Sequence, residues 1–583
     1  MPLGRITASG RYNYNALAGD GSDTFRALNE NRNWRTALLG TVASGALWLM
    51  MPRPASAGPT TCAVSAGVAT CTGDQSAGIA SGADFDPATV NTLNVNTLTT
   101  SIAPASGTAG IYFKRAGAGD TITINSSTTP FSISVIGANG IYASTDGAVT
   151  INHTGDVSAS SGRGISGYSA SSTVSITSSG TLYNGITASG YSGVTINHTG
   201  DSSGAFGIGA TATNGPISIT VNGNVAGAYA ISGNSASGDI NIQHTGNAAG
   251  LVGVYAYAHN GAVSIQNTGT ILGYAGITAN GSAGVTITQT GDVRATQSNG
   301  IIGYSGAGAV SITAQGKITA YGTGIGGNGD AGVTINHTGD ITSRHAAGIA
   351  VYSYGGSTSV TGTGNIKAAG PGIYAYGYNS ATVTHSGAIT STGSHGAGIV
   401  AIGYNGNASI NNSGDVTARH GVGLTAYSQY GSASVTQTGK ITAAVAGIVA
   451  SGYTNATVIH SGDIAVNHGI GIAAEAGHGA ASVSSSGNIN AAFGGIAAHG
   501  FSGVTVAHTG DITASHGSGI VAGALNGAAS ATNTGNITAG NGGGIAAYSL
   551  HGAATTIQTG NVTAVAGGIA AAGDASATVI STG

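Results

Sequence analysis

Histidine is the residue type whose spacing most suggests chemistry. The chain has 583 residues and 16 His, most of them at two fixed positions of a repeated sequence. Seven lie two residues before a Gly that ends a turn tripeptide: His153, His198, His244, His337, His385, His460 and His508. Five lie four residues before a recurring aliphatic residue: His345, His395, His420, His468 and His516. Imidazole is a ligand that zinc prefers, so both sets are candidate metal columns.

Tyrosine forms a second candidate set, a column of possible contact residues. Seven Tyr occur three residues after the same recurring aliphatic position: Tyr168, Tyr257, Tyr304, Tyr352, Tyr376, Tyr427 and Tyr548. We expect this position to point outward, where the rings offer a stacking surface for a glycan or for another copy of the chain. The alternative is that neighbouring rings cover the face of a sheet.

Three short motifs match enzyme signatures, each weakly. Residues 200–204 fit G-x-S-x-G, but chance matches are expected among so many Ser and Gly. Residues 477–479, Gly-His-Gly, resemble a motif of β-helical polygalacturonases, without the paired aspartates and basic R-I-K of those enzymes. Residues 326–330 look like one calcium nonapeptide, a site that needs tandem copies. We therefore predict no catalytic residue, no cofactor and no enzyme activity.

The elements that hold these residues follow from a period of about 24 residues. A tripeptide, usually [HNQS]-[TS]-G, places its Gly at 19 markers from Gly155 to Gly583. An aliphatic residue recurs two residues after the marker, and a second one follows further on, often after Gly. A third segment, such as 333–336, alternates apolar and polar residues. Each period therefore predicts three short strands separated by Gly-rich bends.

Strands this short bury a face only when coils stack and share a core. The predicted fold is all-β, a single-stranded right-handed parallel β-helix of about 24 residues per coil, although the sequence does not fix its hand. The predicted segments are 1–57 as signal peptide, 58–140 as N-terminal disulfide hairpin, cap and first coils, and 141–583 as repetitive β-helix. Thr recurs three residues after the marker, as at Thr319 and Thr442, where stacked charges would repel one another.

Stacking changes the interpretation of the histidines. Successive His of the first set are mostly two coils, roughly 10 Å, apart, which is too far to share one metal ion. Asn267, Gln289, Asn412 and Gln437 take the same position in other coils, so we predict a hydrogen-bonded polar ladder and no metal site. Residues 58–583 carry 9 Lys+Arg and 16 Asp+Glu, a formal charge of −7. Protonation of all 16 His would bring it to +9, so we expect association of rods to respond to acid.

Composition excludes several other classes of protein. The chain has 104 Gly and is only 6% charged, whereas about a quarter of the residues in an ordinary soluble domain are charged. It is too hydrophobic, at 41%, for a disordered chain, and its Gly lacks the collagen period. It also has no basic surface for nucleic acid.

Two features indicate export. Residues 37–51 form an apolar run that is shorter than the roughly 20 residues of a membrane-spanning helix. The run is followed by Ala55-Ser56-Ala57, which predicts signal cleavage between Ala57 and Gly58, with either an extended signal or a start codon assigned too early. Cys62 and Cys71 flank Gly67 in two short alternating segments, which predicts a hairpin closed by a disulfide in an oxidising compartment. Two unpaired thiols are the alternative.

Over residues 58–583 the chain resembles the passenger domains of bacterial autotransporters, adhesin-like proteins of type V secretion. The resemblance rests on the signal segment, the hairpin and repeated units such as GVTINHTGDITSRHAAGIAVYS (332–353). It implies a non-enzymatic adhesin or cell-association stalk, secreted or on the cell surface, with a role in virulence or biofilm. The implied partners are a host or neighbouring-cell surface, a glycan or another copy.

The resemblance also implies an outer-membrane β-barrel after the passenger. This sequence stops at a turn marker, Gly583, so we expect the barrel to be missing because the chain is a fragment or a truncated product. Two alternatives remain at this point: a secreted β-helical enzyme acting on polysaccharides, and a self-associating structural rod.

Overall fold

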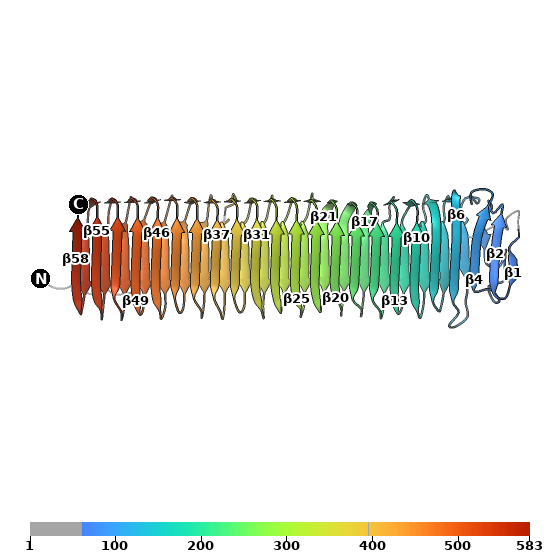
Figure 1. Ribbon diagram of the computed structural model, residues 1–583, viewed down its shortest axis with the longest axis horizontal. Helices are drawn as coiled ribbons and strands as arrows, with labels where there is room; N and C mark the ends of the chain where they lie inside the picture. Colours follow the sequence, from blue (N-terminus) through green and yellow to red (C-terminus); the bar gives the residue numbers. More distant parts are fainter. Residues whose placement is uncertain (1–60, 395, 583) are drawn as a thin grey trace.

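The computed structural model describes residues 61–394 and 396–582, which form a long rod of stacked strands (Figure 1). These residues contain 58 strands and no helix, joined in one hydrogen-bonded network. About 21 turns of about 24 residues make a parallel β-solenoid. The predicted all-β solenoid and its period are confirmed. The predicted cleavage site, Ala57 and Gly58, and His395 of the second histidine set lie outside the described residues.

One coil of the solenoid consists of three strands. The strands are β28 (Gly332–Thr338), β29 (Ile341–Ser343) and β30 (Ile349–Ser353). They pair in parallel with β31 (Ser357–Thr363), β32 (Ile366–Ala368) and β33 (Ile373–Gly377) of the next coil. Equivalent residues of successive coils therefore lie in columns along the rod. Residues at the same position of the sequence repeat are thus neighbours in the structure.

The three-strand pattern is interrupted in the N-terminal half. In three consecutive coils the second and third strands merge into one of 11 residues: β17 (Val225–Ser235), β19 (Ala248–Ala258) and β21 (Ile271–Gly281). The segment that forms a corner elsewhere stays paired here, as Gly227 with Gly250 and Tyr229 with Val252. Three strands per coil is therefore a correct prediction for most of the repeat and wrong for these coils. It is also wrong at β8 (Val149–Ala159), a single strand that pairs with both β10 (Thr173–Ser179) and β11 (Leu182–Tyr183) of the next coil.

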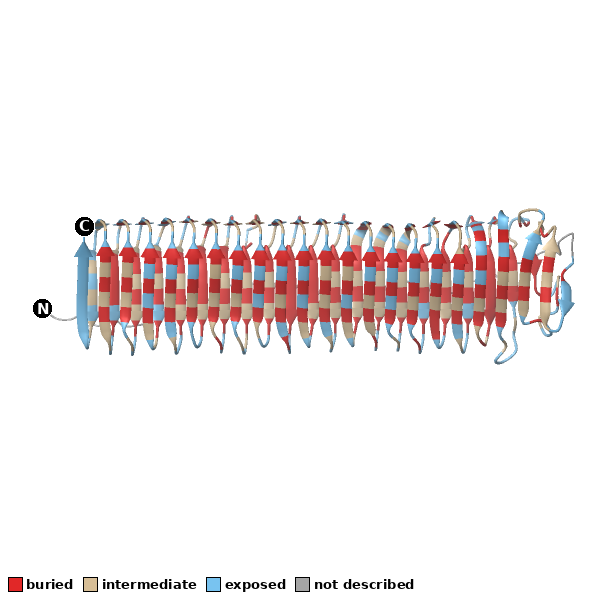
Figure 2. Cartoon of the chain, viewed as in Figure 1, coloured by how far each residue is buried: buried red, intermediate tan, exposed pale blue. Residues whose placement is uncertain are grey.

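The core is a continuous stack of aliphatic side chains inside the coils. In most strands alternate residues point inward, which gives the banded pattern of burial in Figure 2. In β30 all five residues are buried. Ile335, Ile341 and Ile349 represent the three strands of one coil and are at most 1% exposed. Each stacks on an aliphatic residue of the next coil, Val360, Ile366 and Ile373. The buried cluster extends from the first coils to Ala554, so the period-two alternation of the sequence sets which columns face inward.

The marker glycines form a corner that only glycine tolerates. All 18 markers from Gly155 to Gly560 have a positive φ, between 101° and 148°. At Gly364 the φ is 105°, and an added Cβ would collide with the carbonyl oxygen of Gly339 in the preceding coil. A side chain would therefore be strained by the backbone and would separate the coils.

The residue after each marker forms a second ladder, which was not predicted from the sequence. Asp or Asn side chains at this position accept a hydrogen bond from the equivalent backbone N–H of the next coil, at 2.7–3.0 Å. No two Asp are adjacent in this column, and Lys440 separates Asp415 from Asp463. Neighbouring like charges are avoided while the backbone donors are satisfied.

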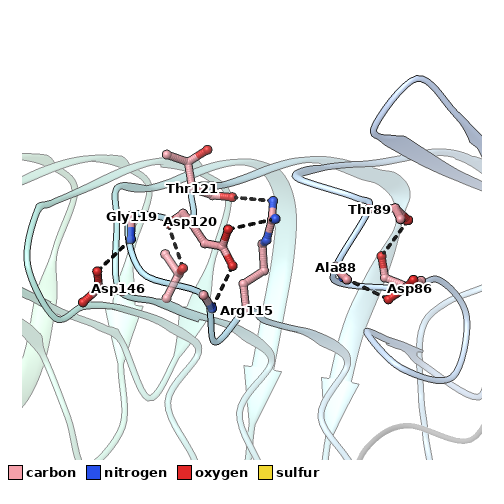
Figure 3. Close-up of polar contacts among 10 residues, drawn as sticks. Asp86, Ala88, Thr89, Arg115, Gly119, Asp120, Thr121 and Asp146 are labelled. Carbon is pink, nitrogen blue, oxygen red and sulfur yellow. Dashed lines mark hydrogen bonds and ion pairs between the residues drawn. The ribbon is translucent and has the colours of Figure 1, made fainter.

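The first coils are more irregular than the repeat. Strands β1 (Ala63–Ser65) and β2 (Val68–Gly73) form an antiparallel hairpin, and a disulfide joins Cys62 to Cys71. The following strands are β3 (Ile79–Ala80), β4 (Thr92–Leu98), β5 (Ile111–Lys114), β6 (Ile122–Val135), β7 (Ile141–Thr145), β8 (Val149–Ala159) and β9 (Ile165–Ser169). Among the described residues, Arg115 and Asp120 make the one ion pair, at 3.0 Å (Figure 3).

Candidate functional site

The predicted tyrosine column exists as a column but not as a continuous contact surface. Strand register places all seven Tyr at equivalent positions, and Tyr352 pairs directly with Tyr376. Elsewhere other side chains intervene, such as Asn280 between Tyr257 and Tyr304. The outward expectation fails most clearly at Tyr352, which is 3% exposed.

Tyr352 is buried because neighbouring rings cover it. It packs with Ala347 and Ala350 in a small cluster outside the main core, against Tyr374 and Tyr376. The ring centroids of Tyr352 and Tyr374 are 5.3 Å apart. Burial raises the pKa of Tyr374 to about 12. Here the alternative considered from the sequence, rings that cover a sheet face, describes the structure better than a contact surface.

A different set of aromatic residues forms an unbroken row at the corner after the third strand. We call this row the aromatic ridge; it comprises Tyr378, Tyr404, Tyr430, Tyr453, His478 and Phe501. The residues follow strands β33, β36 (Ile399–Gly403), β39 (Val422–Ser428), β42 (Ala446–Gly452), β45 (Ile470–Ala476) and β48 (Gly494–Gly500). Six successive coils therefore each contribute one ring.

The rings of the ridge are in contact but do not form a closed stack. Successive centroids are 5.4, 5.5, 6.1, 4.4 and 5.7 Å apart. Tyr378 and Tyr404 are nearly parallel, at 19°, whereas Tyr404 and Tyr430 meet at 82°. Tyr378, Tyr430 and Tyr453 are 37%, 49% and 43% exposed. A hydrogen bond with Tyr430 raises the pKa of Tyr404.

Uncharged polar side chains accompany the rings. Asn379, Asn405 and Gln429 each lie next to a ridge tyrosine in the chain and are exposed. The six corner segments of the ridge contain no Lys, Arg, Asp or Glu: 378–380, 404–407, 429–432, 453–455, 477–479 and 501–502. The ridge thus combines aromatic faces and edges with neutral hydrogen-bonding groups.

The ridge was not predicted from the sequence, although the sequence contains a signal for it. An aromatic residue follows Gly at the end of the third strand in Gly377-Tyr378, Gly403-Tyr404, Gly452-Tyr453 and Gly500-Phe501. The motif at 477–479 was considered only as an enzyme signature. In the structure His478 lies between Tyr453, at 4.4 Å, and Phe501, at 5.7 Å, as part of the row.

The first histidine set lies inside the rod. The seven His are 2–3% exposed and share one inward column with Asn, Gln and Ser. Hydrogen bonds link neighbours in this inner polar column, including Ser126 Oγ with His153 Nδ1 at 2.7 Å and Asn412 Nδ2 to Gln437 Oε1 at 2.7 Å. The predicted ladder is therefore present in part, because Val221, Ala314 and Gly362 occupy the same column and interrupt it. No two of its histidines occupy adjacent coils.

Burial changes the acid–base behaviour of this column. Desolvation lowers the pKa of His153, His385 and His508 to about 4. It also lowers the pKa of His198, His337 and His460. With pKa values of about 4, His153, His385 and His508 are neutral from pH 5 to 8. The charge of +9 that the sequence alone suggested is therefore not reached in the folded rod over that range.

The second histidine set lies at an exposed corner. His345, His420, His468 and His516 follow the short strands and are exposed. His345 contacts the ring of Tyr321 at 4.1 Å, and His516 contacts Phe493 at 5.9 Å. Within residues 61–394 and 396–582 no group of three or more His, Cys, Asp or Glu is placed to hold a metal ion.

The residues of the other sequence motifs lie in ordinary strands of the solenoid. Ser202, the central residue of the G-x-S-x-G match, is 1% exposed and lies between Leu182 and Val225 in an inward column. Residues 326–329 of the calcium-like motif belong to strand β27 (Ile325–Gly329). Two shallow grooves, of about 410 and 400 Å³, run across the first strand of several successive coils. One is lined by residues between Thr436 and Thr534, the other by residues between Asn94 and Thr199. Both are lined largely by Ser, Thr and Asn.

Comparison with known proteins gives no relative: no family model, no curated protein and no solved structure matches the chain. In the part of the chain that the structure describes, no helix is long and apolar enough to cross a membrane. Any functional interpretation therefore rests on the residues themselves.

Proposed function

We propose that the chain is a non-enzymatic, exported rod that acts in adhesion or cell association, the passenger part of an autotransporter-like surface protein. The observation that carries the proposal is the aromatic ridge, six ring-bearing side chains in contact on successive coils of a rod with few charges. Exposed aromatic rows flanked by polar groups are typical of contact surfaces.

Two further features support this proposal. The solenoid repeats each surface position along its length, so one weak contact can be multiplied over several coils. The apolar run and the small residues at 55–57 favour export, and the Cys62–Cys71 disulfide suits an oxidising compartment. An adhesin needs such a rigid, repeated surface and no catalytic group.

A bead assay tests the proposal. Residues 58–583 are coupled to fluorescent beads, and albumin-coated beads serve as the control. We expect the rod-coated beads to cluster with one another, or to bind bacterial or epithelial cells, several-fold more than the albumin beads. Clustering and cell binding at the level of the albumin beads would overturn the proposal.

A further inference from the structure

We propose that the aromatic ridge is a binding site for a linear, uncharged, β-linked polysaccharide that lies along the rod axis. This inference rests on the proposed adhesive function and names the chemical class of its ligand. It assigns binding to Tyr378, Tyr404, Tyr430, Tyr453, His478 and Phe501 rather than to the tyrosine column predicted from the sequence.

The chemical groups of the ridge match those of a sugar chain. Sugar rings present C–H groups on their faces, which pack on aromatic rings, and hydroxyl groups at their edges, which need hydrogen-bonding partners. The ridge supplies both kinds of group, since Asn379, Asn405 and Gln429 are exposed beside Tyr378, Tyr404 and Tyr430. Within the rod, Asn379 donates to the carbonyl oxygen of Gly355 and Gln429 accepts from the hydroxyl of Tyr427. An apolar protein partner would remove water from the remaining polar atoms of these amides, which costs free energy.

The absence of charged residues from the ridge favours an uncharged ligand. The six corner segments of the ridge carry no Lys, Arg, Asp or Glu. An anionic polysaccharide would find no Lys or Arg there to pair with its carboxylates or sulfates, and nucleic acid would find none for its phosphates. The absence of charge in these segments therefore selects a neutral ligand.

The spacing of the rings along the rod matches the spacing of sugars in an extended β-linked chain. Successive coils repeat at about 4.8 Å, and the five centroid distances of the ridge fall between 4.4 and 6.1 Å. The advance of one sugar along an extended β-linked chain is close to this coil repeat, so each coil meets one sugar. A helical α-linked chain curves away from the straight row after a few residues. The match predicts affinity that grows with glycan length.

The test is calorimetric titration of residues 58–583 with cellohexaose, a neutral β-linked hexasaccharide. Maltohexaose, which is α-linked, and hexagalacturonate, which is anionic, are titrated in parallel. We expect cellohexaose to bind at least tenfold more tightly than either of the others and more tightly than cellotriose. No measurable binding of cellohexaose, or equal binding of all three hexasaccharides, would overturn the inference.

Matched variants locate the site. The triple variant Tyr404→Ala, Tyr430→Ala, Tyr453→Ala should weaken cellohexaose binding at least tenfold, and the corresponding Phe variant should keep most of it because the rings remain. The control is Tyr183→Ala, Tyr191→Ala, Tyr274→Ala, three tyrosines that are 45%, 41% and 50% exposed outside the ridge. Equal weakening in the control variant would overturn the assignment, and circular dichroism checks that every variant is folded.

The bead assay separates this inference from the proposed function. Beads coated with the ridge Ala variant should lose the binding that wild-type beads show. If they keep it, adhesion stands and the ridge is not its site. If wild-type beads bind no surface while cellohexaose binds the ridge in solution, adhesion fails and the glycan site stands.

Discussion

The inner polar column and the aromatic ridge are both built by stacking one position of the repeat, yet they have opposite surroundings. His460 belongs to the first and His478 to the second, only 18 residues further along the chain. His460 is 3% exposed and its Nε2 bonds the carbonyl oxygen of Gly462 at 2.9 Å. His478 is exposed and contacts two aromatic rings.

The difference teaches that residue type alone does not mark a functional site in a solenoid. Successive side chains of a strand point to opposite faces, so the position of a residue in its strand, or at a corner, decides whether its side chain faces the core or the solvent. In the inner column, some polar atoms bond one another or backbone carbonyls. Others, such as Asn412 Oδ1 and Asn533 Oδ1, are buried without a hydrogen-bond partner, so the column is costly to bury. In the ridge, rings and amides stay accessible, so they are available to a partner.

The largest expected effect is a loss of stability of the folded rod in acid, caused by the buried histidines of the inner polar column. The pKa values of His153, His385 and His508 are about 4 in the folded rod and about 6.5 when unfolded. Asp156 and Asp511 act in the opposite direction at His153 and His508 but do not offset the burial. The unfolded chain therefore binds more protons between about pH 6.5 and 4. Stability is full above about pH 6.5 and falls by several kcal/mol toward pH 4.

Thermal unfolding followed by circular dichroism from pH 7.5 to 4 measures this loss. The variant His153→Asn, His385→Asn, His508→Asn keeps a polar group at each position and should lose markedly less stability in acid. The control is His345→Asn, His420→Asn, His468→Asn at the exposed corner, which should follow the wild type. A melting temperature that is independent of pH in the wild type would contradict the prediction.

A single buried charge tests the inner column at one coil. Gln437 is fully buried, accepts a hydrogen bond from Asn412 and donates one to the carbonyl oxygen of Gly414 at 2.7 Å. Gln437→Glu removes the donor and introduces a charge, which should cost about 3–5 kcal/mol locally. Thr436→Glu, one residue earlier and outward, should cost less than about 1 kcal/mol.

Hydrogen exchange of strands β37 (Ala408–Ser413), β40 (Ala433–Thr438) and β43 (Ala456–Ser461) is the measurement for this pair of variants. Faster exchange in these strands is expected for Gln437→Glu alone. Similar exchange in both variants would show that burial at this corner does not control stability.

Charge order on the outside of the rod gives a smaller effect. Lys440 separates Asp415 from Asp463 in the column after the marker. Lys440→Asp would place three carboxylates on successive coils, about 4.8 Å apart, and should cost about 1 kcal/mol at low salt. Lys440→Asn, which matches the residue of other coils, should be neutral. Chemical denaturation with and without 0.5 M NaCl checks this, because salt should restore the stability of the Asp variant.

Sequence periodicity was sufficient to predict the solenoid, its period and a ladder of His, Asn and Gln, because stacking makes each of these depend on local residues. The Ser members of that ladder, such as Ser178 and Ser485, were not predicted. Periodicity did not give the merged strands at β17, β19 and β21, since pairing across the corner near Gly227 depends on the neighbouring coils. It also favoured Tyr352 over Tyr430 as a contact residue. Only the packing of Tyr374 and Tyr376 over Tyr352 reverses that order.

The smallest effect on stability is expected in the ridge itself. Tyr430 is 49% exposed and contacts Tyr404 and Tyr453 at 5.5 and 6.1 Å between ring centroids. Tyr430→Ala should cost less than about 1 kcal/mol, because a half-exposed side chain buries little apolar area and substitutions at the surface usually change stability little. Tyr352→Ala should cost about 3 kcal/mol, because it opens a cavity beside Ala347 and Ala350. If denaturant unfolding shows equal losses for the two variants, the ridge is part of the fold's packing and not a surface kept for a ligand.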